Sequence, residues 1–207
     1  MIGKLAAMLR ERAELRLFLV ANALWELTLA ALKTFVVLYI TKGMGLSLST
    51  SSGIIAAVSL LIIVASPVSG KLGDRFGKAR VMRWACTVYG LGFLIPFLIT
   101  NKIVVAVSVP FIAFGGGVVM TLPYALLTPL MDEEEHGALT GYYSFSRGIG
   151  IALGPVIAGA AIGATASSSF FGATHGYQAM WGVCAVAALL SIWPLTALRR
   201  RIGDEED

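Results

Sequence analysis

Six long runs of apolar residues, separated by short polar or charged segments, account for most of the chain. A helix needs about 20 mostly apolar residues to cross a hydrocarbon core of roughly 30 Å. No period-two alternation typical of strands competes with these runs, and in lipid each helix satisfies its own backbone. The pattern therefore predicts an all-α membrane protein, a single six-helix transmembrane bundle with spans near residues 15–41, 52–70, 81–100, 103–130, 139–163 and 178–198.

Composition supports a membrane protein and excludes several function classes. Apolar residues make up 57% of the chain and charged residues only 14%, whereas a soluble domain carries about 25% charge. Cys86 and Cys184 fall inside spans and are expected to be small buried residues. The sequence contains no metal-ligand cluster or nucleophile constellation, so neither an enzyme nor a cofactor is expected.

The distribution of basic residues predicts the orientation. Of sixteen Lys and Arg residues, thirteen lie on the side of the N-terminus, two (Lys42 and Lys102) on the opposite side, and Lys33 within a span. Both termini are therefore expected in the cytoplasm, with the bundle in a bacterial-type plasma (inner) membrane. The net charge of +4 reflects this bias toward the inner membrane surface and does not indicate a nucleic-acid partner.

A glycine-punctuated basic loop, Gly70–Arg80, joins the second and third spans and reads G-x-L-x-D-R-x-G-[RK]-x-[RK]. It resembles the signature loop of major facilitator superfamily transporters. From the residues themselves, the glycines permit a tight reversal and the cations anchor the inner leaflet. The resemblance implies a cytoplasmic latch made of Gly70, Gly73, Asp74, Arg75, Gly77, Lys78 and Arg80.

The resemblance also implies an architecture and a missing partner. Each half of such a transporter has six helices arranged as two inverted three-helix repeats, and this chain divides into two triplets at Asn101. A second six-helix half is therefore expected. Because the chain ends in a charged tail after Leu198, it is expected to be the C-terminal half, with an N-terminal half elsewhere. A homodimer of the chain is the alternative.

Ionisable residues within the first span indicate a transport pathway. Asn22, Glu26 and Lys33 lie within about 40° of one another at 100° per residue, so they form one polar stripe. A charge at a span centre costs roughly 2.5–3.5 kcal/mol on insertion scales. The stripe is therefore expected to face the bundle interior or a water-filled path. Structural alternatives are a packing role for Asn22, a hydrogen-bonding role for Glu26, and an outward-snorkelling Lys33.

Four further positions complete the predicted solute and proton pathway. Arg147, expected near the cytoplasmic end of span five, is either an ion-pair partner for Asp74 or the acidic run 132–135, or an inward-facing relay residue. Span four looks broken at Gly115–Gly117, Pro123 and Pro129, and broken helices mark transporter binding sites. The resemblance likewise places the first and fourth helices along the cavity, so the candidate contacts are Trp25, Thr121 and Tyr124.

Span five carries a run of small residues, Gly150–Gly159, that is similar to the family's G-x-x-x-G-P-x-x-G-G motif. Ala158 replaces the first of the two final glycines, so symport and antiport both remain open. Small residues four apart allow helices to approach closely, and Pro155 can bend the helix. The expected packing and bending positions are Gly150, Gly154, Pro155 and Gly159.

The sequence thus predicts half of a secondary active transporter that moves a small organic solute by alternating access. Proton coupling is expected through Glu26. The alternatives are a homodimeric transporter and a membrane scaffold or assembly protein that transports nothing.

Overall fold

A computed structural model of the protein describes residues 12–130 and 136–203. The elements are α2 (Ala13–Leu38) continued by a π-helical turn (Tyr39–Gly43), α3 (Leu48–Phe76), α4 (Lys78–Leu98) and α5 (Lys102–Leu127). A 3-10 turn (Thr128–Leu130) follows α5, and then come α6 (His136–Thr165), a 3-10 turn (Gly172–Thr174), α7 (Ala179–Leu190) and α8 (Ile192–Gly203). The described residues form no strand.

Local signals at the helix boundaries account for where the helices start and stop. The Ser47 hydroxyl accepts from the Thr50 amide at the start of α3, and the Asn101 side chain accepts from two amides at the start of α5. Such side chains satisfy backbone donors that a helix start leaves free. Between α3 and α4 a single residue, Gly77, reverses the chain with a φ of 86°, a conformation that a residue without Cβ adopts without strain.

The observed helices differ from the predicted spans in three places. Helix α3 runs past Gly70 to Phe76, so most of the signature loop is helical and only Gly77 forms the turn. Helix α5 is continuous through Gly115–Gly117 and Pro123, so the predicted breaks there are wrong. The last span is two helices, with Ser191 between them and Pro194 in the first turn of α8. Pro194 has no backbone N–H to continue the ladder from α7.

The glycines of α5 make close packing possible. A Cβ on Gly115 would lie 2.6 Å from the Tyr89 Cβ of α4, and one on Gly117 would lie 2.8 Å from the Ala65 Cβ of α3. Both distances are shorter than real carbon contacts. The glycine run therefore brings α5 against two neighbours at once, and this packing role replaces the predicted helix break.

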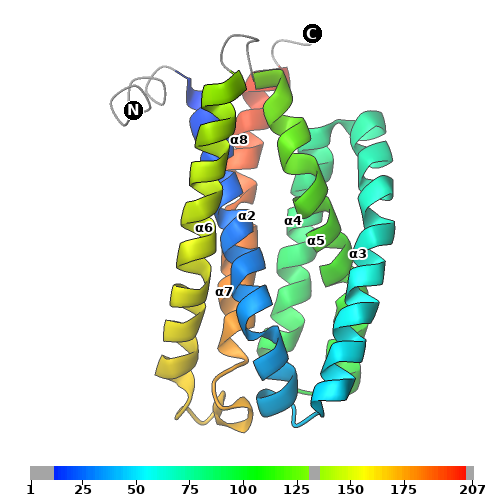
Figure 1. Ribbon diagram of the computed structural model, residues 1–207, viewed down its shortest axis with the longest axis vertical. Coiled ribbons are helices and arrows are strands. Elements are labelled where there is room, and N and C mark those ends of the chain that lie inside the picture. Colours follow the sequence, from blue (N-terminus) through cyan, green and yellow to red (C-terminus); the bar gives the residue numbers. More distant parts are fainter. Residues whose placement is uncertain (1–11, 131–135, 204–207) are drawn as a thin grey trace.

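The helices pack in a pattern that repeats between the two halves of the chain (Figure 1). Helix α2 packs most extensively on α6, and α5 packs on α3; α4 packs on α5, while α7 and α8 pack on α2. Exchanging the first three spans for the last three converts each of these pairs into another observed pair. Six packed helices with this symmetry match the predicted half-transporter architecture.

The core lies where the helices meet. Its largest fully buried side chains include Phe18, Trp25, Tyr39, Tyr89 and Phe93. Cys86 and Cys184 are free thiols with no exposed surface. Large apolar residues on the outer surface, such as Leu60, Ile63 and Trp193, are more than half exposed, as expected of side chains that face lipid.

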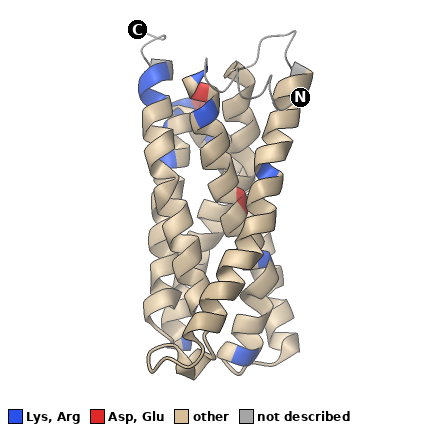
Figure 2. Ribbon diagram, turned by 90° about the vertical axis from the view of Figure 1, so that its left-hand side faces the viewer, with Lys and Arg blue, Asp and Glu red and all other residues tan. Residues whose placement is uncertain are grey.

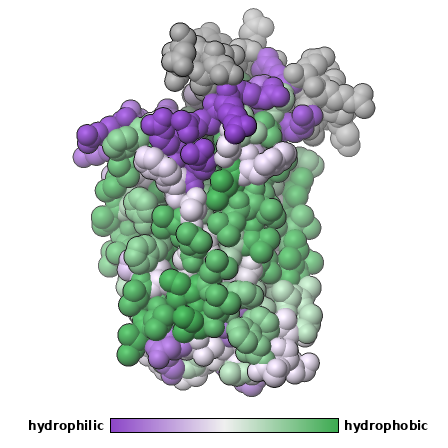
Figure 3. Space-filling view, turned by 180° about the vertical axis from the view of Figure 1, so that it is seen from behind, coloured by the Kyte–Doolittle hydropathy of each residue, from purple (hydrophilic) through white to green (hydrophobic). Residues whose placement is uncertain are grey.

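Six helices are long and apolar enough to cross a membrane among the residues that the structure describes. Lys and Arg gather at the end that holds both termini (Figure 2), here called the basic end and defined by Arg16, Lys71, Arg75, Lys78, Arg80, Arg83 and Arg199–Arg201. A hydrophobic belt follows, and the opposite end carries Lys42 and Lys102 (Figure 3). The chain is therefore an integral membrane protein whose charges lie mainly at one end.

Candidate functional site

The seam between α2 and α6 brings together most of the predicted polar residues. Both helices start at the basic end and run in parallel (Figure 1). The side-chain amide of Asn22, which has no exposed surface, donates to the Ser146 hydroxyl at 2.7 Å and to the Tyr143 carbonyl at 3.4 Å. These bonds hold the two helices in register, so the structure places Asn22 in helix packing.

Farther along the same seam, the backbones of α2 and α6 approach each other closely. A Cβ on Gly150 would collide with the Ala23 carbonyl oxygen, and one on Gly154 would collide with the Leu27 carbonyl oxygen. A Cβ on Gly159 would lie 3.3 Å from the Phe35 ring. Pro155 lies within the continuous α6. The small residues of span five thus allow α6 to pack against the backbone of α2, and this close approach is what lets short polar side chains meet across the seam.

Along α6, an ion pair lies between the Asn22–Ser146 hydrogen bond and the close approach at Gly150. The Arg147 Nε is 2.9 Å from a Glu26 carboxylate oxygen; the Glu26 side chain is 12% exposed and that of Arg147 is 50% exposed. Glu26 follows Ala13 by thirteen residues and Arg147 follows His136 by eleven, so both lie roughly 16–20 Å into their helices. The carboxylate is therefore mostly covered, whereas its partner is half exposed.

This pairing corrects the expectation for Arg147. The sequence predicted a position near the cytoplasmic interface, with either an ion pair to Asp74 or the acidic run, or an inward-facing relay role. The structure instead pairs Arg147 with Glu26 well inside the span, and the relay role stays a prediction. The acidic run 132–135 lies outside the described residues. Glu26 and Arg147 lie at similar depths in two parallel helices, and a comparison of these depths could have predicted the pair. Each charge alone costs roughly 2.5–3.5 kcal/mol in a span centre, and pairing offsets part of that cost.

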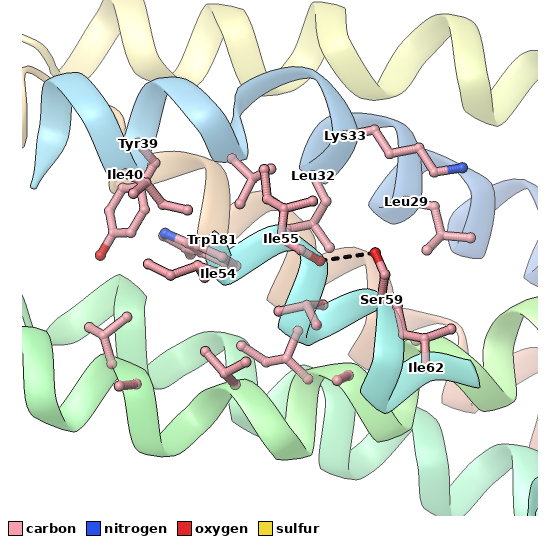
Figure 4. A pocket seen from close by; sticks show the side chains of 18 of the residues that line it. Leu29, Leu32, Lys33, Tyr39, Ile40, Ile54, Ile55, Ser59, Ile62 and Trp181 are labelled. Carbon is pink, nitrogen blue, oxygen red and sulfur yellow. Dashed lines mark hydrogen bonds between the residues drawn. The ribbon is translucent and has the colours of Figure 1, made fainter. Parts of the chain in front are cut away.

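Lys33 lies farther along α2 and has different neighbours. Its side chain is exposed and makes no ion pair within the described residues. It lines a cavity between α2, α3 and α5, and Figure 4 shows it reaching along α2 over Leu29. Glu26 and Lys33 thus share one stripe but serve separate sites.

The aromatic candidates fall into two groups. Trp25 is 1% exposed and packs edge-on against Phe18 in the core, so it does not reach a cavity. Tyr124 is 52% exposed and meets the ring of Tyr143 edge-on, with centroids 6.1 Å apart. Thr121 is exposed but donates to the Gly117 carbonyl of its own helix at 2.8 Å. Trp25 and Tyr124 both join the aromatic group beside the α2–α6 seam, since Phe18 also stacks on Tyr143, but of these two only Tyr124 is exposed.

The signature loop holds one unpaired carboxylate at the basic end. Asp74 is exposed and makes no ion pair with any described residue, while the Arg75 guanidinium lies 5.1 Å from the centroid of the Phe76 ring. Gly73 is buried against Leu122 of α5, whereas Gly70 has no neighbour near its Cβ position. Lys78 and Arg80 start α4. The loop therefore presents Asp74 outward, available to a group outside the described bundle.

Comparison with known proteins decides the family. The Major Facilitator Superfamily model matches residues 18–206. The chain belongs to this superfamily. A probable transporter of Streptomyces coelicolor is 31% identical over 182 residues, which cover 82% of this chain and 37% of that protein. A multidrug resistance protein of Erwinia billingiae is 28% identical, covering 75% of this chain and 36% of its own length.

A multidrug transporter protein of Bacillus subtilis is 29% identical over 135 residues, which cover 63% of this chain and 25% of that protein. The chain thus spans between a quarter and two fifths of the length of these relatives. Major facilitator proteins are transporters, which agrees with the expectation that the chain is not an enzyme. Six spanning helices correspond to half of the superfamily fold.

Proposed function

We propose that this chain is one six-helix half of a secondary active transporter that moves a small organic solute by alternating access, with proton coupling at Glu26. The observation that carries the proposal is the Glu26–Arg147 ion pair inside the spans. Relatives described as multidrug transporters support an organic solute. The other predicted pathway residues with exposed side chains lie on helices α2 and α5; they are Lys33, Thr121 and Tyr124.

The chemistry of the pair suits proton coupling. When ionised, Glu26 holds Arg147 and locks α2 to α6 by charge. A proton on Glu26 removes that charge, so the guanidinium loses its counter-ion and must find another, in water or on a solute. The seam would then exist in two charge states with different preferred partners, which is what coupling a proton to a conformational change requires.

The orientation follows from the charge distribution. We place the basic end in the cytoplasm, because an excess of Lys and Arg marks cytoplasmic loops, and the bundle in a bacterial-type plasma membrane. The Gly70–Arg80 loop then lies at the inner surface, where the outward-facing Asp74 can bind a second six-helix bundle. That second bundle is either a separate N-terminal half or another copy of this chain. In the alternative, a membrane scaffold that transports nothing, the ion pair would serve only to hold α2 against α6.

The decisive experiment replaces Glu26 in membranes of cells that produce the chain in its natural genetic context, so that any second bundle is present. Glu26→Gln keeps the shape and hydrogen-bonding capacity of the side chain. Accumulation of labelled organic cations, anions and neutral solutes driven by a pH gradient is expected to vanish, while counterflow exchange persists in part. Glu14→Gln is the matched control, because Glu14 pairs with Arg201 at 3.1 Å at the basic end. Full pH-driven accumulation by Glu26→Gln would place coupling elsewhere.

A further inference from the structure

A cavity of about 520 Å³ lies in the half of the bundle away from the basic end. Its walls come from α2, α3 and α5, and Tyr89 of α4 and Trp181 of α7 also line it; Figure 4 shows Trp181 near Tyr39 and Ile54. Cavities of this size hold drug-sized ligands. Nearly all lining side chains are aliphatic or aromatic, for example Leu32, Ile55 and Ile62. The body of any occupant is therefore apolar.

The charges at this cavity have one sign. Lys33 and Lys102 line it, and no carboxylate does. The three Asp and Glu residues that the structure describes are Glu14, Glu26 and Asp74. Glu26 is held by Arg147, Glu14 by Arg201, and Asp74 lies in the basic-end loop. Within the described chain, Lys33 therefore has no anion to neutralise it.

The neutral polar groups of the lining residues add no negative charge that would compete with a ligand for Lys33. The Ser59 hydroxyl donates to the Ile55 carbonyl at 2.9 Å, as the dashed line in Figure 4 marks. The Tyr39 hydroxyl and the Trp181 indole nitrogen are buried and have no hydrogen-bond partner in the described protein. A cationic ligand would meet like charge here, and a neutral ligand would leave the ammonium of Lys33 uncompensated in an apolar wall, which costs free energy.

We infer that this cavity binds an amphipathic organic anion, with its single negative group on Lys33 and its apolar body along α3 and α5. The charge-assisted contact fixes the head, and burial of the chain supplies the affinity through the hydrophobic effect. The claim that this anion is the transported solute rests on the proposed transport function. The claim that the anion binds here depends only on the cavity and its lysines.

The test uses dodecanoate that carries a diazirine, photolysed with the chain in phosphatidylcholine nanodiscs. Labelling is expected on α2, α3 or α5 at the cavity wall. Unlabelled dodecanoate should compete, whereas dodecanol and dodecyltrimethylammonium, which have the same chain, should not. Lys33→Met should reduce the labelling about tenfold, the size expected for a lost charge-assisted bond, and Lys33→Arg should retain most of it.

Lys42→Met is the matched control, since Lys42 is exposed in the π-helical turn but does not line the cavity. Because an uncompensated charge in an apolar wall costs free energy, Lys33→Met is expected to fold, and an unchanged Tm of the variant would show that a loss of labelling reports on binding. Equal competition by the alcohol or the cation, unchanged labelling of Lys33→Met, or labelling confined to other helices would overturn the inference.

Transport assays separate this inference from the proposed function. Labelled dodecanoate that binds through Lys33 but is not moved by a pH gradient would overturn the anion as the transported solute. Glu26-dependent accumulation of other solutes without cavity labelling would overturn the binding site and leave the transporter proposal standing.

Discussion

Glu26 has a partner that its own helix does not supply. The sequence grouped it with Lys33 on one stripe of α2, but their separation along the axis is about 10 Å, and depth decides which helix each side chain meets. Glu26 reaches Arg147 on α6, while Lys33 lines the cavity beside α3. Helical periodicity could predict the shared face, but not the identity of the partner helix.

Removing Arg147 should expose what the pair contributes. Arg147→Gln leaves the mostly covered Glu26 carboxylate without its counter-ion, so unfolding free energy should fall by about 1–3 kcal/mol. The measurement is denaturant unfolding in detergent micelles, and Arg147→Gln combined with Glu26→Gln should recover much of the loss. Additive effects of the two substitutions would show that the ion pair contributes little to stability.

Helices α2 and α6 illustrate how element-level packing depends on single atoms. The sequence predicted close approach at the small residues of span five, because four-residue spacing places them on one face, and Gly150 and Gly154 lie against the α2 backbone. It wrongly suggested that Gly115–Gly117 breaks the fourth span. Glycine lowers helix propensity in either case, and only the positions of Tyr89 and Ala65 show why α5 needs these residues.

Gly150→Ala should therefore destabilise the bundle. The added Cβ meets the Glu26 Cβ at 2.8 Å and the Leu27 nitrogen at 2.9 Å, so α6 must move away from α2. We expect a loss of about 1–3 kcal/mol, typical of overpacking, seen as a lower Tm by intrinsic fluorescence. Gly148→Ala, two residues away with open space at its Cβ position, is the control. Equal Tm values for both variants would contradict the assigned seam.

The α3–α4 loop gives a second element-level prediction. Asp74→Asn removes a charge that no described residue uses, so the Tm of the chain should not change. Transport turnover in the natural assembly should fall sharply, because the resemblance assigns this loop to a latch. Unimpaired turnover would reduce the loop to a basic membrane anchor.

The architecture of the whole molecule was the feature that the sequence predicted best. Length, apolar periodicity and the signature loop were enough to predict six spans and the superfamily, and the family match covers nearly all of the chain. The neighbours of each helix could not be predicted, because a sequence indicates how deep a residue lies in the membrane but not which helix lies beside it. The cavity and the ion pair both arise from such lateral neighbours.

Orientation can be tested on the intact bundle. Cysteines placed at the exposed Ser49 and Ser169 should react with an impermeant maleimide in whole cells, whereas one at Lys71 should react only after permeabilisation. The expected pattern follows from the concentration of Lys and Arg at the basic end. The reverse pattern would invert the proposed topology.

The rate at which the two native thiols react with a reagent can report how often the bundle opens. Cys86 and Cys184 have no exposed surface, and the Cys184 sulfur lies 3.7 Å from the Thr28 carbonyl of α2. A thiol reagent can reach them only when α4 or α7 separates from its neighbours, so their reaction rate measures how often the closed bundle opens. A compound that binds the closed bundle should slow this reaction, so the thiols can be used to screen for ligands.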